Sequence, residues 1–457
     1  MQIKFYTFEI MKNVSLVVSL LLLLGCGTAK PVKFEVADTE SKKGKETPRF
    51  LNIKIFEQAD AKGIGPCEPS IFINPKHPNH IVAGSVLNYV HHSEDGGKTW
   101  DTERLTSSLG VWGDPVITAD SEGTFYYFHL SDPEGTNWMS DQILDRIVVQ
   151  KSLDYGKTWG DGIGIGLNPP KQQDKEWSTV DPDTGHIYTA WTEFDAYKSA
   201  APEDKSRILF STSSDQGQHW SAPIAISEYE GDCLDGDQTT EGALPISYKG
   251  EIYVAWAYDH RIWFDRSTDQ GRTWLDKDIV VTEQKAGWNF DVPGLGRTNG
   301  MPVLDVDRSD SPHAGTLYIN WSDQKENGDT DIFLSRSKDQ GQTWSTPSRV
   351  NTDTTTTHQF MTWMSIDPSS GYLYILYYDR SQYTDNRTDV TLSVSKDGGN
   401  SFISYKISET PFDPSGSGFF GDYTNIHAAN GVIRPIWTRY ANRKIGVWTA
   451  LIDADQL

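Results

Sequence analysis

Short runs of apolar residues recur along the chain, and most have the length of a β-strand rather than of a helix. Typical runs are RIVVQKS (146–152), SRILFSTS (206–213), RIWFDRS (261–267), DIFLSRS (331–337) and DVTLSVS (389–395). They are rich in β-branched and aromatic residues, and polar turn residues follow them. The pattern predicts an all-β protein made of many short strands.

An eight-residue phrase follows each of these runs. Its six copies are SEDGGKTW (93–100), SLDYGKTW (152–159), SSDQGQHW (213–220), STDQGRTW (267–274), SKDQGQTW (337–344) and SKDGGNSF (395–402). The steps between successive Asp residues are 59, 61, 54, 70 and 58. A period of this size fits a four-stranded β-propeller blade, with the phrase in the turn between the third and fourth strands.

The repeated phrase resembles the Asp box of the BNR-repeat, or sialidase-like, superfamily. The resemblance covers nearly the whole chain after residue 50 and implies a β-propeller. Ser and Asp side chains can accept hydrogen bonds from turn N–H groups, Gly can take positive φ, and the aromatic ring can pack between blades. We therefore expect the boxes to be structural and the chemistry to lie elsewhere.

The strand count predicts one blade more than there are boxes. Two further apolar runs precede each box, and a seventh set without a box follows the last one at 422–430, 431–439 and 444–451. This seventh set lacks a fourth strand, and LNIKIF at 51–56 is left unassigned at the other end of the chain. Pairing the two would close the ring and remove an exposed edge. The sequence thus favours seven blades. Six blades, as in the sialidases, are the alternative.

The N-terminal region reads as an export signal. Met11-Lys12-Asn13 precedes the apolar run 14–24, and Gly25-Cys26 follows it. The ending LLGC resembles a bacterial lipobox, which implies lipidation of Cys26 and an anchored protein of the cell envelope, in the outer membrane, the periplasm or on the cell surface. An ordinary cleaved signal is the alternative. The expected organisation is a signal at 1–26, a polar tether at 27–50 and a propeller at 51–457.

Charge and cysteine content limit the partners. A formal net charge of −22 argues against nucleic acid or an anionic membrane surface as the main partner, so membrane contact is expected only through the lipid anchor. We expect a monomer. Cys67 and Cys233 could form a disulfide, but the sequence does not show whether they meet. No CxxC or HExxH spacing predicts a metal site. No cofactor is required, although converging carboxylates leave room for a structural Ca²⁺.

The propeller geometry directs the search for a site to the face opposite the boxes, where the loops between second and third strands meet the connections between blades. Residues expected just before the first strands are Glu68, Asp114, Glu176, Glu241, Asn299, His358 and Asp422. Those expected after the second strands are Asn88, His129, Glu193, Tyr258, Asp259, His260, Arg261, Asp323, Tyr378, Asp379, Arg380, Arg439 and Tyr440. The connection WNFDVPGLGRTNGM adds Arg297.

The resemblance to sialidases implies one chemistry for this face. Sialidases use three Arg on the substrate carboxylate, a Tyr nucleophile activated by Glu, and an Asp acid–base. Glu241 stands where sialidases carry the activating Glu. The Arg expected in the next strand is absent from VAWA (254–257), and Glu68-Pro69-Ser70 replaces the first-blade RIP-like motif. Both departures count against sialidase activity.

Elimination from a uronic acid is the chemistry that we rank first. The predicted architecture is also similar to that of seven-bladed polysaccharide lyases acting on ulvan. Elimination needs a cation on the carboxylate and a His or Tyr to remove the C5 proton. The catalytic candidates are His129, His260, His358, Tyr258, Tyr378 and Tyr440; the substrate-binding candidates are Arg261, Arg297, Arg380, Arg439 and Glu241.

The sequence therefore predicts an enzyme acting on an acidic, uronate-containing oligo- or polysaccharide. Elimination would make it a lyase, or a dehydratase where C4 carries a free hydroxyl. A sialidase-like glycoside hydrolase is the second hypothesis. A non-catalytic glycan-binding propeller is the third, because the fold alone does not establish an activity.

Overall fold

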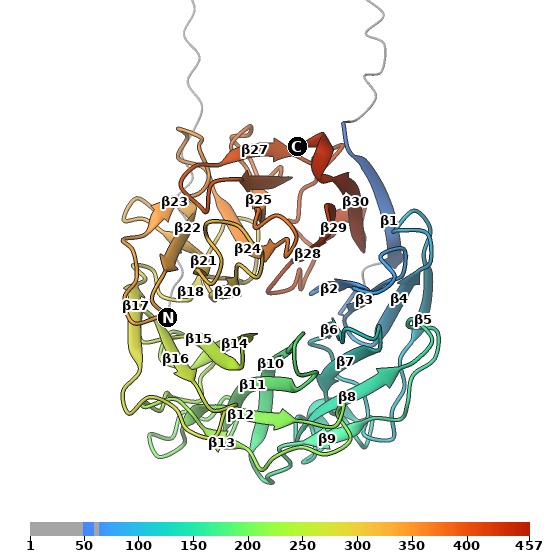
Figure 1. The fold of residues 1–457 in the computed structure, drawn as a ribbon, viewed down its shortest axis with the longest axis vertical. Helices are drawn as coiled ribbons and strands as arrows, with labels where there is room; N and C mark the ends of the chain where they lie inside the picture. Colours follow the sequence, from blue (N-terminus) through green and yellow to red (C-terminus); the bar gives the residue numbers. More distant parts are fainter. Residues whose placement is uncertain (1–48, 59–63) are drawn as a thin grey trace, which may run out of the picture. The chain divides into compact units, whose positions relative to one another are not determined.

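The computed structural model describes residues 49–58 and 64–457, which form a ring of β-sheets around a central axis (Figure 1). Within these residues there are seven four-stranded antiparallel sheets and one two-stranded ribbon. The all-β class and the seven-bladed propeller are thus confirmed, and the six-bladed alternative is wrong. The expected signal, Cys26 and nearly all of the tether lie outside the described residues.

The first four blades follow one another along the chain. Blade 1 contains β2 (Ser70–Ile73), β3 (Ile81–Ser85), β4 (Tyr89–Ser93) and β5 (Asp101–Arg104). Blade 2 contains β6 (Val116–Ala119), β7 (Phe125–Leu130), β8 (Ile147–Ser152) and β9 (Ile163–Ile165). Blade 3 contains β10 (Gln172–Val180), β11 (Ile187–Phe194), β12 (Ser206–Ser213) and β13 (Ile224–Ala225). Blade 4 contains β14 (Glu241–Tyr248), β15 (Glu251–Tyr258), β16 (Arg261–Ser267) and β17 (Ile279–Glu283).

The remaining blades follow a short inserted ribbon. The ribbon consists of β18 (Asn289–Phe290) and β19 (Thr298–Asn299). Blade 5 contains β20 (Val303–Val306), β21 (Leu317–Gln324), β22 (Thr330–Ser337) and β23 (Ser348–Arg349). Blade 6 contains β24 (Gln359–Ile366), β25 (Leu373–Asp379), β26 (Asp389–Ser395) and β27 (Ile403–Lys406). Two 3₁₀ helices, η1 (Asn137–Met139) and η2 (Ala454–Gln456), complete the described elements.

The seventh blade joins the two ends of the propeller. It contains β28 (Asn425–Ala429), β29 (Val432–Ala441), β30 (Lys444–Asp453) and, as its outermost strand, β1 (Leu51–Gln58). β1 pairs antiparallel with β30 from Leu51↔Leu451 to Gln58↔Ile445. The blue and dark red strands meet accordingly in Figure 1. This pairing closes the ring as the sequence predicts.

The Asp boxes occupy the turns between the third and fourth strands. In blade 5 the Ser337 hydroxyl donates to Asp339 at 2.7 Å, and the Asp339 carboxylate accepts the backbone N–H of Thr343 at 2.9 Å. Gly341 has φ +80°, and a Cβ there would lie 2.1 Å from the Phe264 ring of the preceding blade. Trp344 packs edge-on against Phe264, with ring centroids 5.2 Å apart. The box therefore fixes a turn and joins two blades.

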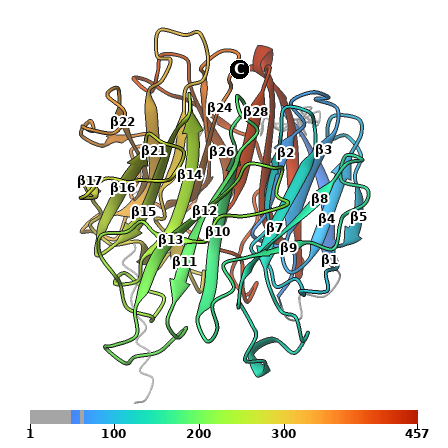
Figure 2. The same cartoon turned by 60° about the horizontal axis from the view of Figure 1, so that its bottom comes forward.

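The core lies between adjacent blades. Fully buried Trp residues recur on the second strands of four blades, namely Trp191, Trp256, Trp321 and Trp437. Figure 2 shows the propeller turned from the axial view of Figure 1, so that the blades are seen from the side.

Within the described part of the chain, no helix has the length and apolar character needed to cross a membrane.

Candidate functional site

The first strands of three blades carry a bulge near their starts, on the face opposite the boxes. Each bulge contains a residue with positive φ, namely Lys175 on β10, Gly242 on β14 and Met361 on β24. Glu68 and Asp114, with φ values of 48° and 49°, take the corresponding places two residues before β2 and β6. A bulge redirects the local side chain. Lys175 thereby reaches the carboxylates of Glu68, Asp114 and Asp422, which precede the first strands of blades 1, 2 and 7.

The Lys175 ammonium group is buried among three carboxylates. Its nitrogen lies 3.3 Å from Asp114, 3.5 Å from Asp422 and 3.8 Å from Glu68. Burial acts to lower the pKa of Lys175, but Asp114, Glu68 and Asp422 outweigh it and raise that pKa. Lys175 is therefore a fixed positive charge that holds neighbouring blades together at the axis.

A second cation comes from the ribbon between blades 4 and 5. Arg297, just before β19, forms ion pairs of 2.9 Å with both Asp235 and Asp422. Asp235 also accepts hydrogen bonds from the Tyr197 hydroxyl at 3.0 Å and the Lys198 ammonium at 2.8 Å. Although burial opposes the shift, Arg297 and Lys198 lower the pKa of Asp235. Arg297 thus links Asp422 at the axis to Asp235 in the chain segment between blades 3 and 4.

These groups make up what we call the axial cluster. Its members are Glu68, Asp114, Asp174, Lys175, Glu176, Lys198, Asp235, Glu241, Arg297 and Asp422. Three cations balance the three carboxylates of Asp114, Asp235 and Asp422. Of the four further carboxyl groups, Glu68 shares Lys175, and Asp174, Glu176 and Glu241 form no ion pair within the described residues. Burial is the largest cause of the raised pKa of each of these four.

Asp174 differs from the other three acids in its access to solvent. Glu68, Glu176 and Glu241 are at most 2% exposed, whereas Asp174 is half-buried on the bulged strand β10. Burial, and next the charge of Asp114, raise the pKa of Asp174 to about 7. Asp174 can therefore carry a proton near neutral pH at a position that a ligand can reach. This is the property required of a general acid.

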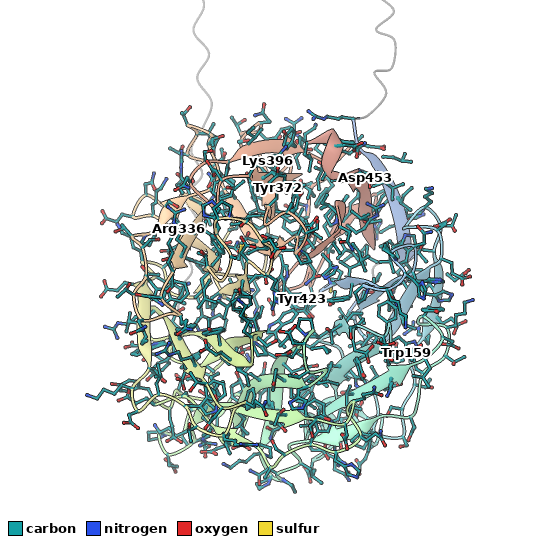
Figure 3. All side chains as sticks on the ribbon, viewed as in Figure 1. Trp159, Arg336, Tyr372, Lys396, Tyr423 and Asp453 are labelled. Carbon is teal, nitrogen blue, oxygen red and sulfur yellow. The ribbon has the colours of Figure 1, made fainter. Side chains whose placement is uncertain are left out.

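An aromatic layer lies next to the cluster on the axis. Trp177 contacts Trp363 and Tyr423, with ring centroids 4.5 and 4.9 Å apart, and the Lys175 nitrogen lies 5.1 Å from the Tyr423 ring centroid. Figure 3 labels Tyr423 near the centre of the ring, with Trp159 of a box farther out. The aromatic layer gives the charged groups surroundings of low polarity, which strengthens their mutual interactions.

A cavity of about 640 Å³ lies on the axis and reaches the opposite side of the aromatic layer. Trp177 and Trp363 belong to its lining, and so do the turns between first and second strands, such as those at Asp183, Lys249 and Asp310. These turns share the face of the boxes. The cavity walls contain many apolar first-strand residues, so the space is distinct from the charged cluster.

The structure brings several of the residues singled out in the sequence into the axial cluster. Glu241 and Arg297, both proposed as substrate-binding residues, belong to it, together with Glu68, Asp114, Glu176 and Asp422. Asn299 is close by, because its side-chain amide donates to the Asp422 carbonyl at 2.6 Å. The expected face thus holds a concentration of titratable groups.

Three candidates from blade 6 and its neighbourhood have other partners. Arg380 is 2% exposed and donates to the Pro293 carbonyl at 2.7 Å, and burial lowers its pKa to about 10. Tyr378 is buried, and its hydroxyl donates to the Thr438 carbonyl at 3.1 Å. His358 is half-buried, with Nδ1 3.0 Å from the Thr330 hydroxyl. None of these contacts involves the axial cluster.

The other candidates are spread over the second and third strands. His129 is fully buried, with its two ring nitrogens 2.8 Å from the Leu130 carbonyl oxygen and 3.1 Å from the Gln150 side-chain nitrogen. Burial lowers the pKa of His129 to about 4. Three of the remaining candidates have partners outside the cluster: Tyr258 donates to the Glu230 carbonyl, Arg261 pairs with Asp259, and Arg439 donates to Thr410. His260 is exposed in the β15–β16 turn, and Tyr440 is half-buried on β29.

Sequence reasoning missed Lys175, Asp174 and Asp235. Glu176 was expected just before the first strand of blade 3, and the bulge on β10 brings its neighbour Lys175 to the axis as well. The sequence did contain a signal for Lys175. When Trp177 is aligned with Ser70 and Val116, the residue two positions earlier is Lys175 in blade 3, Glu68 in blade 1 and Asp114 in blade 2. Asp235 lies in an irregular connection, where hydrophobic periodicity gives no information.

The described residues show neither a disulfide nor a metal-binding arrangement. Cys67 and Cys233 are both buried and free. Across 49–58 and 64–457, no group of three or more His, Cys, Asp or Glu residues is arranged to hold a metal ion. In the axial cluster, the Lys175 ammonium itself lies among the converging carboxylates.

Comparisons with known proteins find similarity in structure only. No protein-family model and no curated protein matches the chain. An ulvan lyase of polysaccharide lyase family PL25 is 13% identical, with a TM-score of 0.53 over 87% of this chain and 96% of that chain. Its complex with -[GlcA(1-4)Rha3S]- gives a TM-score of 0.52. The likeness shows the fold alone. The NanB sialidase from Streptococcus pneumoniae, at 12% identity and a TM-score of 0.48 over 75% of this chain and 68% of that chain, is too distant to support an argument.

Proposed function

We propose that this protein is a carbohydrate-active enzyme that hydrolyses a glycosidic bond at the axial cluster. The observation that carries the proposal is Asp174, a half-buried carboxyl group with a pKa of about 7 next to Asp114, whose carboxylate pairs with Lys175. A carboxyl group that holds a proton near neutral pH, next to a second carboxyl group, is the arrangement that glycoside hydrolysis needs.

The roles follow from the surroundings of each group. Asp174 donates a proton to the departing glycosidic oxygen, because it holds a proton near neutral pH and is reached from solvent. Asp114 supplies negative charge opposite the developing oxocarbenium ion, and Lys175 holds Asp114 in place at 3.3 Å. The bond between the anomeric carbon and the oxygen breaks, and water supplies the hydroxyl group of one product and the proton that restores Asp174.

Elimination is the second candidate, and one observation favours it. Lys175 and Arg297 place two cations in the same cluster, and a cation on the uronate carboxylate is what elimination requires. Both cations are already paired with carboxylates, however, and burial raises the pKa of the nearby Tyr423 phenol, which makes Tyr423 a poor base. The described residues of the cluster therefore support hydrolysis better.

One experiment separates these reactions. The protein is incubated with cello- and xylohexaose, a fluorogenic sialoside and an oligosaccharide of the repeat -[GlcA(1-4)Rha3S]-, while reducing ends and ultraviolet absorbance are followed. New reducing ends without an ultraviolet rise indicate hydrolysis, and a rise from an unsaturated uronate indicates elimination. Binding without products would contradict catalysis and favour a glycan-binding propeller.

A further inference from the structure

An exposed tryptophan stands on the face that carries the axial cluster. Trp138 belongs to η1, in the connection from β7 to β8, and 53% of its surface is exposed. Among the described tryptophans it is the most exposed. An exposed indole ring on the face of the candidate site offers a flat apolar surface with a polar N–H edge to a ligand.

Neighbouring aromatic rings hold Trp138 in a defined orientation. Its ring stacks on Tyr197, with centroids 5.3 Å apart and planes inclined by 13°. Trp112 packs edge-on against it at 6.2 Å and 87°. The three rings come from different connections, namely 105–115, 131–146 and 195–205. One face of Trp138 is thus supported, while much of the side chain faces solvent.

The supporting ring is bonded directly to the axial cluster. The Tyr197 hydroxyl donates to Asp235 at 3.0 Å, and Asp235 pairs with Arg297 at 2.9 Å. The backbone N–H of Tyr197 donates to the Gln172 side chain at 2.7 Å, at the start of the strand that carries Asp174. The stacked rings and the proposed catalytic acid are therefore built on one framework.

We propose that Trp138, supported by Tyr197 and Trp112, is a sugar-binding subsite that stacks against a pyranose ring of the substrate. The inference rests on the proposed function and adds to it a place for a sugar unit away from the bond that is cleaved. The C–H face of a pyranose is apolar and flat, and an exposed indole ring is its natural partner. Asp174, the half-buried acid of the cluster, can accept hydrogen bonds from sugar hydroxyls.

The test measures binding separately from turnover. In the Asp174→Asn protein, affinity for the hexasaccharides used above is measured by calorimetry and by tryptophan fluorescence. Trp138→Ala is expected to weaken binding by about tenfold and to remove the fluorescence change. The matched control is Met139→Ala, because Met139 is the next residue, is 81% exposed and has no ring. It is expected to leave affinity unchanged.

The outcomes distinguish the subsite from the catalytic assignment. Unchanged affinity in Trp138→Ala, or an equal loss in Met139→Ala, would overturn the subsite. Full turnover in Asp174→Asn together with weakened binding in Trp138→Ala would overturn the catalytic role of Asp174 and leave the subsite standing. Failure of the parent protein to bind any of these oligosaccharides would overturn both.

Discussion

The ammonium nitrogen of Lys175 lies 3.3 Å from the carboxylate of Asp114, which joins blade 3 to the start of blade 2 at the propeller axis. Lys175 is 5% exposed, and the surrounding carboxyl groups come from blades far apart in the sequence. The same contact thus links two blades at the axis and positions the groups that we assign to catalysis.

Replacing Lys175 is expected to destabilise the whole propeller. Lys175→Met leaves buried carboxylates without their cation, which costs about 3–5 kcal/mol of unfolding free energy. The cost should be larger at pH 8 than at pH 5, because the carboxyl groups can take up protons at the lower pH. Chemical denaturation at both pH values measures it.

Lys76→Met is the control for this substitution. It removes an ion pair of 2.7 Å between exposed side chains, Lys76 and Glu122, and surface pairs contribute little. The denaturation midpoint of Lys76→Met should stay close to that of the parent. Equal stability losses in the two variants would show that Lys175 has no special role.

The raised pKa of Asp174 predicts a descending limb in the pH profile of activity. The protonated form acts as the acid, so kcat/KM should fall as pH rises through about 7. Asp174→Asn should lower kcat/KM by about 10²–10⁴-fold and abolish this limb. A profile of unchanged shape in this variant would assign the limb to another group.

The same group makes stability depend on pH. The carboxyl of Asp174 has a pKa of about 7 in the folded protein and about 3.9 when unfolded, so the folded state binds more protons between these values. Its contribution to stability therefore decreases as pH rises from about 4 to about 7. In Asp174→Asn, unfolding free energy should decline less over this range, as urea denaturation at several pH values would record.

Ring closure by β1 predicts a position-dependent effect along that strand. Ile55 is 7% exposed and packs with Ile71, Ile436 and Val447, so Ile55→Ala should cost about 2–4 kcal/mol. Leu51 on the same strand is 54% exposed, and Leu51→Ala should change stability by no more than about 0.5 kcal/mol. Similar melting temperatures for the two variants would argue that β1 does not close the ring in solution.

The fold could be predicted from sequence because its signals are local. The box phrase fixes a turn through contacts within eight residues, such as Ser337 to Asp339, and its spacing measures the blades. Closure by β1 followed from one strand left over at the start of the count and one strand missing from the last set. The site was predictable only as a face, since Glu68, Asp114 and Asp422 lie two or three residues before first strands.

The individual site residues depend on features that periodicity does not reveal. A one-residue bulge on β10 brings Lys175 to the axis beside Glu176. His129 lies at the end of a second strand, yet β7 continues to Leu130 and keeps the imidazole buried. Asp235 is linked to the cluster by Arg297, which lies over sixty residues later in the chain, just before β19.

The most direct test compares two aspartates on opposite faces of the propeller. Turnover of the oligosaccharides by the parent, Asp174→Asn and Asp339→Asn is measured at pH 6. We predict loss of turnover in Asp174→Asn with an unchanged fold, and retained turnover with a lower melting temperature in Asp339→Asn, whose box turn loses hydrogen bonds. Retained turnover in Asp174→Asn, together with loss in a folded Asp339→Asn, would contradict the assignment of the site to the axial cluster.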